Sequence, residues 1–182
     1  MVTPDERGMP LPTDEPAFRS FVDQEYTRLV RALTLFCGDV GVAEELAQDA
    51  FARAFQRWGH VAAMERPGAW VRTVAFNLAR SRFRRGAAER RALARHGAAP
   101  TMEAATEVAD GIAVREAVAA LPSRQREVLI HRYFLGASVA ETAADVGISE
   151  NAVKSAAFKG IENLRHQLGH DVSVIEETAD HA

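Results

Sequence analysis

The stretch that decides the fold is Val139–Leu168, VAETAADVGISENAVKSAAFKGIENLRHQL. Its first eight residues place apolar side chains at one-sided spacing, which predicts a short helix. Gly147 then supplies the left-handed conformation that closes a helix, and Ser149 is a good N-cap for the next one. Two helices joined by so tight a turn predict a helix-turn-helix, a motif that commonly places its second helix in the major groove of DNA.

The second helix of this motif has two faces of different composition. We expect the apolar face to pack on its neighbours and the polar face to contact DNA. The apolar face contains Val153, Ala157, Ile161, Leu164 and Leu168. The polar face contains Asn151, Lys154, Ser155, Phe158 and Lys159. Other helix pairs joined by Gly-Ile-Ser would share part of this pattern, so the motif does not identify the class of DNA-binding protein.

The composition is that of an ordinary globular protein, with 182 residues of which 47% are apolar and 26% charged. Such a length allows one domain or two small ones. No apolar run approaches a membrane span, and the polar, proline-rich N-terminus does not resemble a signal peptide. A single cysteine, Cys37, excludes an internal disulfide and provides no metal framework. We therefore expect a cytoplasmic protein without a metal or cofactor.

Charge is segregated along the chain. The net charge of −3 argues against a generally basic coat. Nine arginines and one acidic residue nevertheless lie between Arg66 and Arg95. The tail over 169–182 instead has four acidic residues and no lysine or arginine. We expect that tail to be solvating, or else to contact the arginine-rich segment and restrain DNA binding, and we expect the leader over 1–16 to be flexible.

The N-terminal half predicts a helical domain over 17–86. Apolar residues recur at helical spacing over 17–36 and over 42–58, and Asp39 is positioned to cap the second of these helices. The polar face of that second helix begins with acidic residues. It includes Glu45, Gln48 and Asp49. This face is either a solvated surface that suits the positive helix end or a docking surface for a basic partner, and periodicity does not separate the two.

A third helix, predicted over 69–85, is strongly basic toward its end. Cations suit the C-terminus of a helix, but five arginines exceed that need. Trp70, Phe76 and Phe83 are interleaved with these arginines. Aromatic and cationic side chains together favour a surface that neutralises phosphates and stacks on unpaired bases.

A change of composition marks a second domain. Residues 87–109 are alanine-rich and poor in large apolar residues, which predicts a linker. The apolar pattern then returns and predicts a four-helix domain over 110–168. In its helix over 124–134, we expect Tyr133 and Phe134 to join the apolar face together with earlier valine and leucine residues.

We expect His131, on the same helix, to be a surface or packing residue rather than a metal ligand, because no partner ligand lies at suitable spacing.

These segments together resemble the extracytoplasmic-function (ECF) group of the bacterial sigma-70 family, the small two-domain RNA polymerase sigma factors. AEELAQDAFARAFQRW is similar to the family's region 2.2, and RPGAWVRTVAFNLARSRFRR to its regions 2.3 and 2.4. VREAVAALPSRQREVLIHRYFLGASVAETAADVGISENAVKS, with its LPxxxREV run, is similar to region 4. The match runs in order from Phe18 to Leu168. It implies an all-α fold of two small helical domains, the sigma region 2 and region 4 domains.

The resemblance implies a sigma factor that binds core RNA polymerase at the β′ clamp helices and the β flap, recognises the −35 and −10 promoter elements and promotes DNA melting. It assigns polymerase binding to Glu45, Gln48, Asp49 and Phe51. It assigns the −10 element to Trp70, Asn77, Arg80, Arg84 and Arg85. It assigns the −35 element to Ser149, Asn151, Lys154, Ser155, Phe158 and Lys159. An anti-sigma factor is a further partner that the resemblance allows.

The chain departs from the family pattern at four positions. Many members have an arginine at the position of Ala156 and a basic or polar residue at that of Phe158. The family's usual arginine is replaced by Phe76 in region 2.3, and its common aspartate by Ser81 in region 2.4. The promoter sequence therefore cannot be carried over from relatives.

Two other classes of function stay open. A stand-alone helix-turn-helix regulator would bind duplex DNA without being a polymerase subunit, but it leaves the acidic and arginine-rich helices unexplained. An enzyme is disfavoured because the sequence has no Gly-rich phosphate loop, clustered metal ligands or nucleophile–base signature. We therefore expect no catalytic residue, no small-molecule substrate and no membrane insertion.

Overall fold

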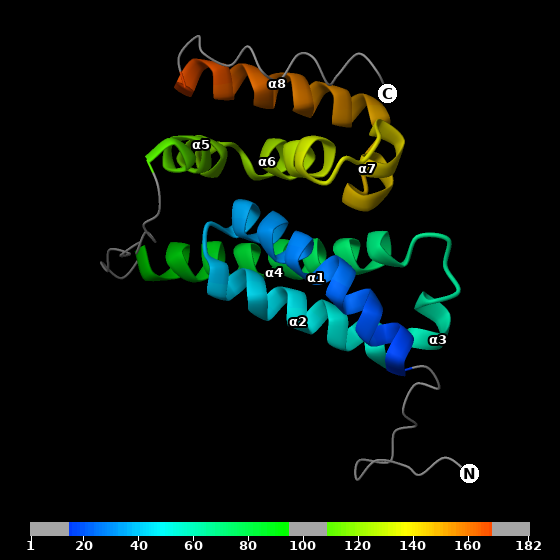
Figure 1. Ribbon diagram of the computed structural model, residues 1–182. Helices are drawn as coiled ribbons and strands as arrows, with labels where there is room; N and C mark the ends of the chain where they lie inside the picture. Colours follow the sequence, from blue (N-terminus) through cyan, green and yellow to red (C-terminus); the bar gives the residue numbers. More distant parts are fainter. Residues whose placement is uncertain (1–14, 95–108, 169–182) are drawn as a thin grey trace, which may run out of the picture.

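The structure is a computed structural model that describes residues 15–94 and 109–168. The predictions for the leader up to residue 14, for the linker over 95–108 and for the acidic tail fall outside the described residues. Within them every regular element is a helix, which confirms the predicted all-α fold. The helices form two stacked layers, with α1–α4 in one and α5–α8 in the other (Figure 1). None of the described helices is both long and apolar enough to cross a membrane.

The N-terminal layer is built from three long helices, α1 (Glu15–Cys37), α2 (Val40–Gln56) and α4 (Pro67–Ala94), with the short α3 (Trp58–Val61) at one end. Asp39 caps α2 as predicted, because its side chain accepts a hydrogen bond from the Val42 amide at 2.8 Å. Helix α4 continues past the predicted end of the domain, so the first residues assigned to the linker are helical. The buried core includes Leu29, Leu33, Phe36, Leu46, Phe51 and Val71.

An aromatic cluster ties the start of α1 to the end of α2. The ring of Phe18 lies 5.0 Å from that of Phe55 and 5.1 Å from that of Trp58, measured between centroids. Phe21 also lies 5.1 Å from Trp58. Pairs at these spacings stabilise a core beyond simple burial, so the two ends of the helical hairpin are held together.

The C-terminal layer has the four helices predicted. They are α5 (Ala109–Ala120), α6 (Ser123–Leu129) with its continuation η1 (Ile130–Phe134), α7 (Val139–Val146) and α8 (Glu150–Leu168). The segment η1 is a π-helical turn, which shifts the register of the side chains that follow. Ile130 and His131 are buried there, whereas Tyr133 is 41% and Phe134 38% exposed. The predicted apolar role of these last two residues is therefore wrong.

The helix-turn-helix has the predicted geometry. Gly147 has φ of +72° and closes α7, and Ser149 accepts a hydrogen bond from the Ala152 amide at 3.3 Å. Gly160 lies where α8 crosses α6, and a Cβ there would come within 2.9 Å of Leu129 Cδ1. The absence of a side chain at Gly160 therefore allows α8 to pack closely against Leu129 of α6.

Candidate nucleic-acid and partner interfaces

Helix α8 lies on the side of the C-terminal layer away from the N-terminal layer (Figure 1), and its predicted DNA-facing side chains are exposed to solvent. The exposed residues are Ser149, Asn151, Lys154, Ser155, Phe158 and Lys159. Among the described residues, Phe158 is the most exposed large apolar side chain, at 62%. Ala156 instead lies partly buried against the core of the C-terminal layer. The face that the sequence assigned to DNA is thus continuous and uncovered.

The acidic face of α2 is also uncovered. Glu45, Gln48 and Asp49 are exposed, and the Glu45 carboxylate pairs with Arg82 of α4 at 2.7 Å. Phe51 is only 5% exposed and belongs to the core. Phe51 therefore has almost no exposed surface, and its side chain packs α2 against the core of the N-terminal layer.

The −10 candidates on α4 are in mixed environments. Asn77, Arg84 and Arg85 are exposed, whereas Trp70 is partly buried against the core of the N-terminal layer. The Arg80 side chain is 21% exposed and pairs with Glu127 of α6. Arg80 also donates to the side-chain oxygen of Asn77. Three of the five candidates, Trp70, Asn77 and Arg80, are therefore already engaged within the chain by packing or by hydrogen bonds.

The aromatic part of the predicted base-stacking surface is only partly present. Phe76 is fully buried, so the expectation that it stacks on bases is wrong for this arrangement. Its ring packs on that of Phe36 at 5.3 Å and on the ring of His131 at 4.6 Å. Phe83 is partly exposed and packs edge-on against Phe36 at 5.5 Å. Spacing alone did not reveal that a second layer covers this side of α4.

His131 fills the space between the two layers. Its ring is fully buried, and its Nδ1 lies 3.5 Å from Oδ2 of Asp145 on α7. Of the two roles that the sequence favoured over a metal ligand, surface or packing, the structure shows packing. Within the described residues, no three histidine, cysteine, aspartate or glutamate side chains are grouped to hold a metal.

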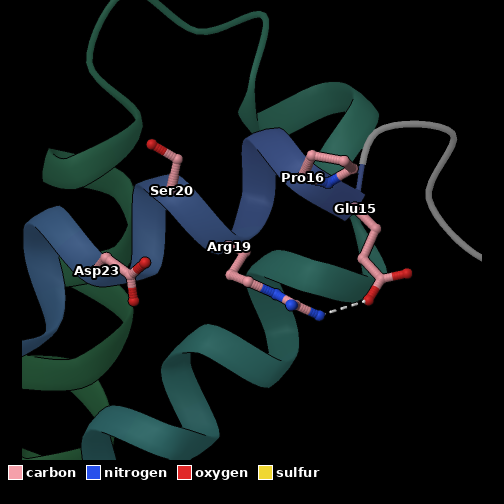
Figure 2. Close-up of a pocket in the computed structure, with 5 residues that line it drawn as sticks. All are labelled: Glu15, Pro16, Arg19, Ser20 and Asp23. Atoms are coloured by element: carbon pink, nitrogen blue, oxygen red, sulfur yellow. Dashed lines mark hydrogen bonds and ion pairs between the residues drawn. The ribbon is translucent and has the colours of Figure 1, made fainter.

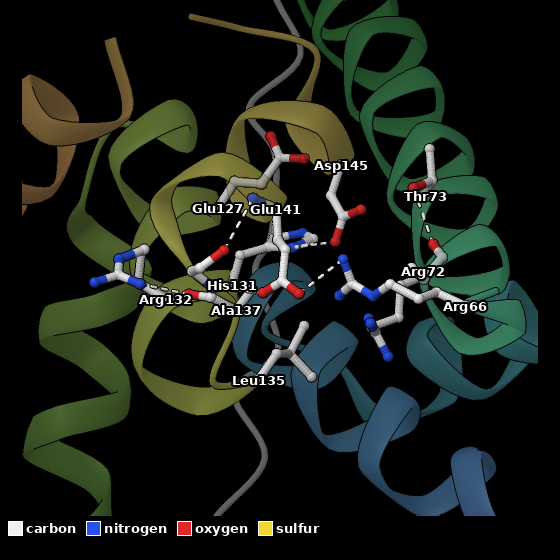
Figure 3. Close-up of polar contacts among 12 residues, drawn as sticks. Arg66, Arg72, Thr73, Glu127, His131, Arg132, Leu135, Ala137, Glu141 and Asp145 are labelled. Carbon is white, nitrogen blue, oxygen red and sulfur yellow. Dashed lines mark hydrogen bonds and ion pairs between the residues drawn. The ribbon is translucent and has the colours of Figure 1, made fainter. Parts of the chain in front are cut away.

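Glu127 is the most deeply buried acid at this interface, at 2% exposure (Figure 3). Burial raises the pKa of its carboxyl above the usual range, and the neighbouring Arg80 offsets only part of that rise. The carboxylate therefore depends on Arg80 for its charged form.

Ionic and hydrogen-bond contacts from both layers join them further. Arg66 pairs with Glu141 at 2.8 Å. Arg28 of α1 donates to the Leu135 carbonyl at 2.6 Å, and Arg126 of α6 donates to the Phe36 carbonyl at 2.7 Å. Arg28 and Arg126 each bind a carbonyl at or near the end of a helical segment in the other layer, where such groups lack helical partners.

Apolar packing continues across the same interface, because Ile130 and Leu135 belong to the core of the N-terminal layer. No local pattern in the sequence marks Ile130 and Leu135 for this packing. Arg126 and Glu127, which make polar contacts across the same interface, belong to the LPxxxREV run.

A shallow hollow beside the first turns of α1 does not have the features of a ligand site (Figure 2). Among the described residues its lining comes from one helix and consists of Glu15, Pro16, Arg19, Ser20 and Asp23. An exposed ion pair between Arg19 and Glu15, at 3.1 Å, spans part of it. Ligand sites are usually enclosed hollows with a few convergent polar groups, whereas this surface is open and two of its charged groups pair with each other.

Comparisons with known proteins identify both layers. The chain matches the family "Sigma-70 region 2" over residues 21–89 and the family "Sigma-70, region 4" over residues 112–164. It is 31% identical over 156 residues to the ECF RNA polymerase sigma factor SigL of Mycobacterium tuberculosis (strain ATCC 25618 / H37Rv), covering 82% of this chain and 88% of that relative. It is 27% identical over 151 residues to the RNA polymerase sigma-E factor of Streptomyces coelicolor, covering 83% and 85%.

Solved structures agree with this fold. The sigma factor RpoE of Bartonella quintana, in complex with the anti-sigma factor NepR, matches with a TM-score of 0.71 at 22% identity, over 85% of this chain and 98% of that chain. CnrH, in complex with the cytosolic domain of CnrY, matches with a TM-score of 0.60 at 25% identity, over 87% and 92%. The chain therefore belongs to the ECF group of the sigma-70 family of RNA polymerase sigma factors.

Proposed function

We propose that this sigma factor docks on core RNA polymerase through α2, reads the −35 element with α8 and opens the −10 element with α4. The observation that carries the proposal is the uncovered polar face of α8 together with an arginine-rich α4 in the same chain. Two DNA-contacting helices in separate domains match a task that requires contact with two promoter elements. The protein acts as a non-catalytic subunit in the cytoplasm.

On α8, phosphate contacts and base contacts come from different side chains. Lys154 and Lys159 supply the charge that neutralises phosphates. Asn151 and Ser155 can hydrogen-bond to base edges in the major groove. The exposed phenyl ring of Phe158 favours a thymine, because the thymine methyl group offers an apolar contact in that groove.

On α2, the carboxylates and amide of Glu45, Gln48 and Asp49 suit a basic surface on core polymerase. On docking, the Glu45 carboxylate would leave its exposed ion pair with Arg82 and pair with a cationic side chain of the partner. Such exposed pairs contribute little, so the exchange costs little. Because RpoE and CnrH were solved with an anti-sigma factor and with the cytosolic domain of CnrY, we infer that a protein inhibitor is also a partner here.

Reconstitution tests this assignment. The purified chain should co-elute with core polymerase and support transcripts from specific promoters, whereas a stand-alone regulator would bind duplex DNA but do neither. Transcription from a template library with a randomised −35 element then tests the base reading. Phe158→Ala should lose a thymine preference at one position, whereas Lys154→Ala should lower output uniformly. An unchanged preference in Phe158→Ala would remove the thymine contact from the proposal.

A further inference from the structure

We propose that Arg80 is a positioning residue that fixes the orientation of the Asn77 side-chain amide, so that Asn77 donates hydrogen bonds to a base of the −10 element and does not accept them from one. At the base that Asn77 contacts, this orientation favours a keto base, guanine or thymine, over an amino base, adenine or cytosine. The inference rests on the proposed role of α4 in opening the −10 element.

Asn77 and Arg80 lie next to each other on one face of α4. Residues three apart along a helix are neighbours on its surface, so the Arg80 side chain is within reach of the Asn77 amide. Trp70 and Arg84 lie two helical turns before and after Asn77, which places them on the same face. Asn77 itself is exposed. Its amide is therefore accessible to a base that approaches this face.

The chemistry of arginine determines which end of the amide it contacts. One terminal nitrogen of the Arg80 guanidinium donates a hydrogen bond to Oδ1 of Asn77. Arginine is always protonated and has no acceptor, so only the oxygen of an amide is favourable beside it. The two N–H donors of Asn77 are therefore at the other end of the amide, away from Arg80.

Glu127 of α6 holds the same guanidinium through its other terminal nitrogen. A guanidinium presents its donors in a rigid fork, so the two nitrogens bind different partners at the same time. The contact with Glu127 joins two domains, whereas Arg80 and Asn77 belong to one helix. Because of this difference, we expect the orientation of Asn77 to persist when the contact with Glu127 is weakened.

An amide whose oxygen is engaged by a cation selects different bases from a free amide. A free asparagine binds adenine by donating from its nitrogen and accepting with its oxygen. With Oδ1 of Asn77 beside Arg80, a base amino group that approaches this oxygen meets the donors of the guanidinium. The N–H groups of Asn77 instead pair with O6 of guanine or O4 of thymine, whereas N6 of adenine and N4 of cytosine are donors and oppose them.

Nuclear magnetic resonance measures the orientation without DNA. The side-chain amide signals of Asn77 in the isotope-labelled full chain are assigned by their loss in Asn77→Asp. Arg80→Ala is made in a Glu127→Gln background, so that no buried carboxylate is left without its cation, and should shift these signals. Arg84→Ala in the same background removes the same charge from an exposed position on this face, and should shift them less. Equal shifts in the two variants would overturn the contact.

Transcription then measures the base preference. Reconstituted holoenzyme transcribes a barcoded template library with a randomised −10 element, and the barcodes in the RNA report the output of each sequence. The Glu127→Gln background should favour guanine and thymine at one position by about fivefold, near the lower end of the discrimination that a good side-chain–base pair gives. Adding Arg80→Ala should reduce this preference to less than about twofold. Arg80→Lys should restore part of it, because lysine also donates to Oδ1.

Asn77→Asp should have the opposite effect on the same position. The aspartate keeps an oxygen beside Arg80 but presents an acceptor in place of the N–H donors, so the preference should reverse toward adenine and cytosine. Arg84→Ala should lower the output of all sequences and leave the preference unchanged. A preference that survives the loss of Arg80, or that does not reverse in Asn77→Asp, would overturn the proposal. An absence of promoter-dependent transcripts from the wild-type chain would instead contradict the proposed function, and the amide signals would then decide the role of Arg80.

Discussion

The two helices proposed to meet promoter DNA present their side chains in opposite ways. Helix α8 has its polar face in solvent, whereas the middle of α4 lies beneath the layer that carries α8. One domain therefore both displays one proposed DNA-contacting surface and covers part of the other. The contrast teaches that the accessible charge of this protein is set by domain packing as much as by its arginine content.

The largest expected contrast concerns thiol reactivity on the covered and open sides. Burial raises the pKa of Cys37, at the end of α1, to about 12, although Arg82 and Arg126 oppose that rise. An exposed thiol ionises near about 8.5, so a cysteine introduced as Ser155→Cys in a Cys37→Ser background should be far more reactive. Iodoacetamide should alkylate Cys37 about a hundredfold more slowly at pH 8, after allowing for the greater nucleophilicity of a high-pKa thiolate.

The pH profile sharpens this test. The Cys37 rate should rise with each pH unit up to pH 10 without a plateau, because the folded protein keeps this thiol protonated. The Ser155→Cys rate should level off above its ordinary pKa. Equal rates at pH 8 would show that the end of α1 is not shielded.

The next prediction tests whether the position of α8 depends on the close contact between Gly160 and Leu129 of α6. Gly160→Val should place methyl groups against Leu129 and destabilise the fold by about 2 kcal/mol, as overpacking of a core typically does. Urea unfolding measures the change. Gly59→Val is the matched control, because no atom lies within 4 Å of a Cβ at that exposed glycine. If both variants lost the same free energy of unfolding, the close contact between Gly160 and Leu129 would not be the cause of the destabilisation.

Duplex binding by the free protein should separate the two helices directly. Lys154→Ala should weaken binding to random duplex DNA about three- to tenfold and reduce the salt slope by about one. Arg80→Ala should change affinity by less than about twofold, because Glu127 already occupies this arginine and the variant loses little accessible charge. Fluorescence anisotropy at several salt concentrations measures both. Equal losses would show that α4 is as open as α8.

The smallest effect concerns the contact of α7 with the start of α4. Ser138 and Glu141 form a capping box at the beginning of α7, and Glu141 also pairs with Arg66. Ser138→Ala should cost about 1 kcal/mol of stability, as loss of an N-cap typically does. Calorimetry or urea unfolding at neutral pH measures this loss.

Acid should narrow the difference between Ser138→Ala and the wild-type chain. Hydrogen bonds from Ser138 lower the pKa of Glu141. A carboxyl with a lowered pKa stabilises the folded state above its unfolded pKa, and this contribution disappears as the pH falls through the lowered value. A difference that stayed constant from pH 7 to pH 3 would contradict the role of the Glu141 carboxylate in the cap.

Much of this fold could be predicted because its determinants are local. Gly147 and Ser149 mark the turn by chemistry that acts over a few residues, and Asp39 does the same for α2. The exposed face of α8 followed from its helical period. These features depend on neighbours along the chain, which a single sequence contains.

The errors arise where contacts are long-range. Phe76 matched an aromatic base-stacking pattern, but His131, from another domain, packs on its ring. Tyr133 and Phe134 fitted an α-helical period that a π-helical turn interrupts. Neither the π-helical turn nor the hydrogen bond from Arg28 to the Leu135 carbonyl produces a periodic pattern in the sequence. Residue type therefore predicted which side chains are polar, but not which of them another domain covers.

The π-helical turn has a consequence for how this family's domains recombine. Before it, Val128 and Leu129 pack in the core of region 4, and after its start, Ile130 and Leu135 pack in that of region 2. A region 4 grafted from a relative with an uninterrupted helix would keep its groove-reading surface but present different residues to α1. Such a chimaera would keep the exposed face of α8 while losing the packing of Ile130 and Leu135 on region 2, so the two domains of this protein are not freely interchangeable modules.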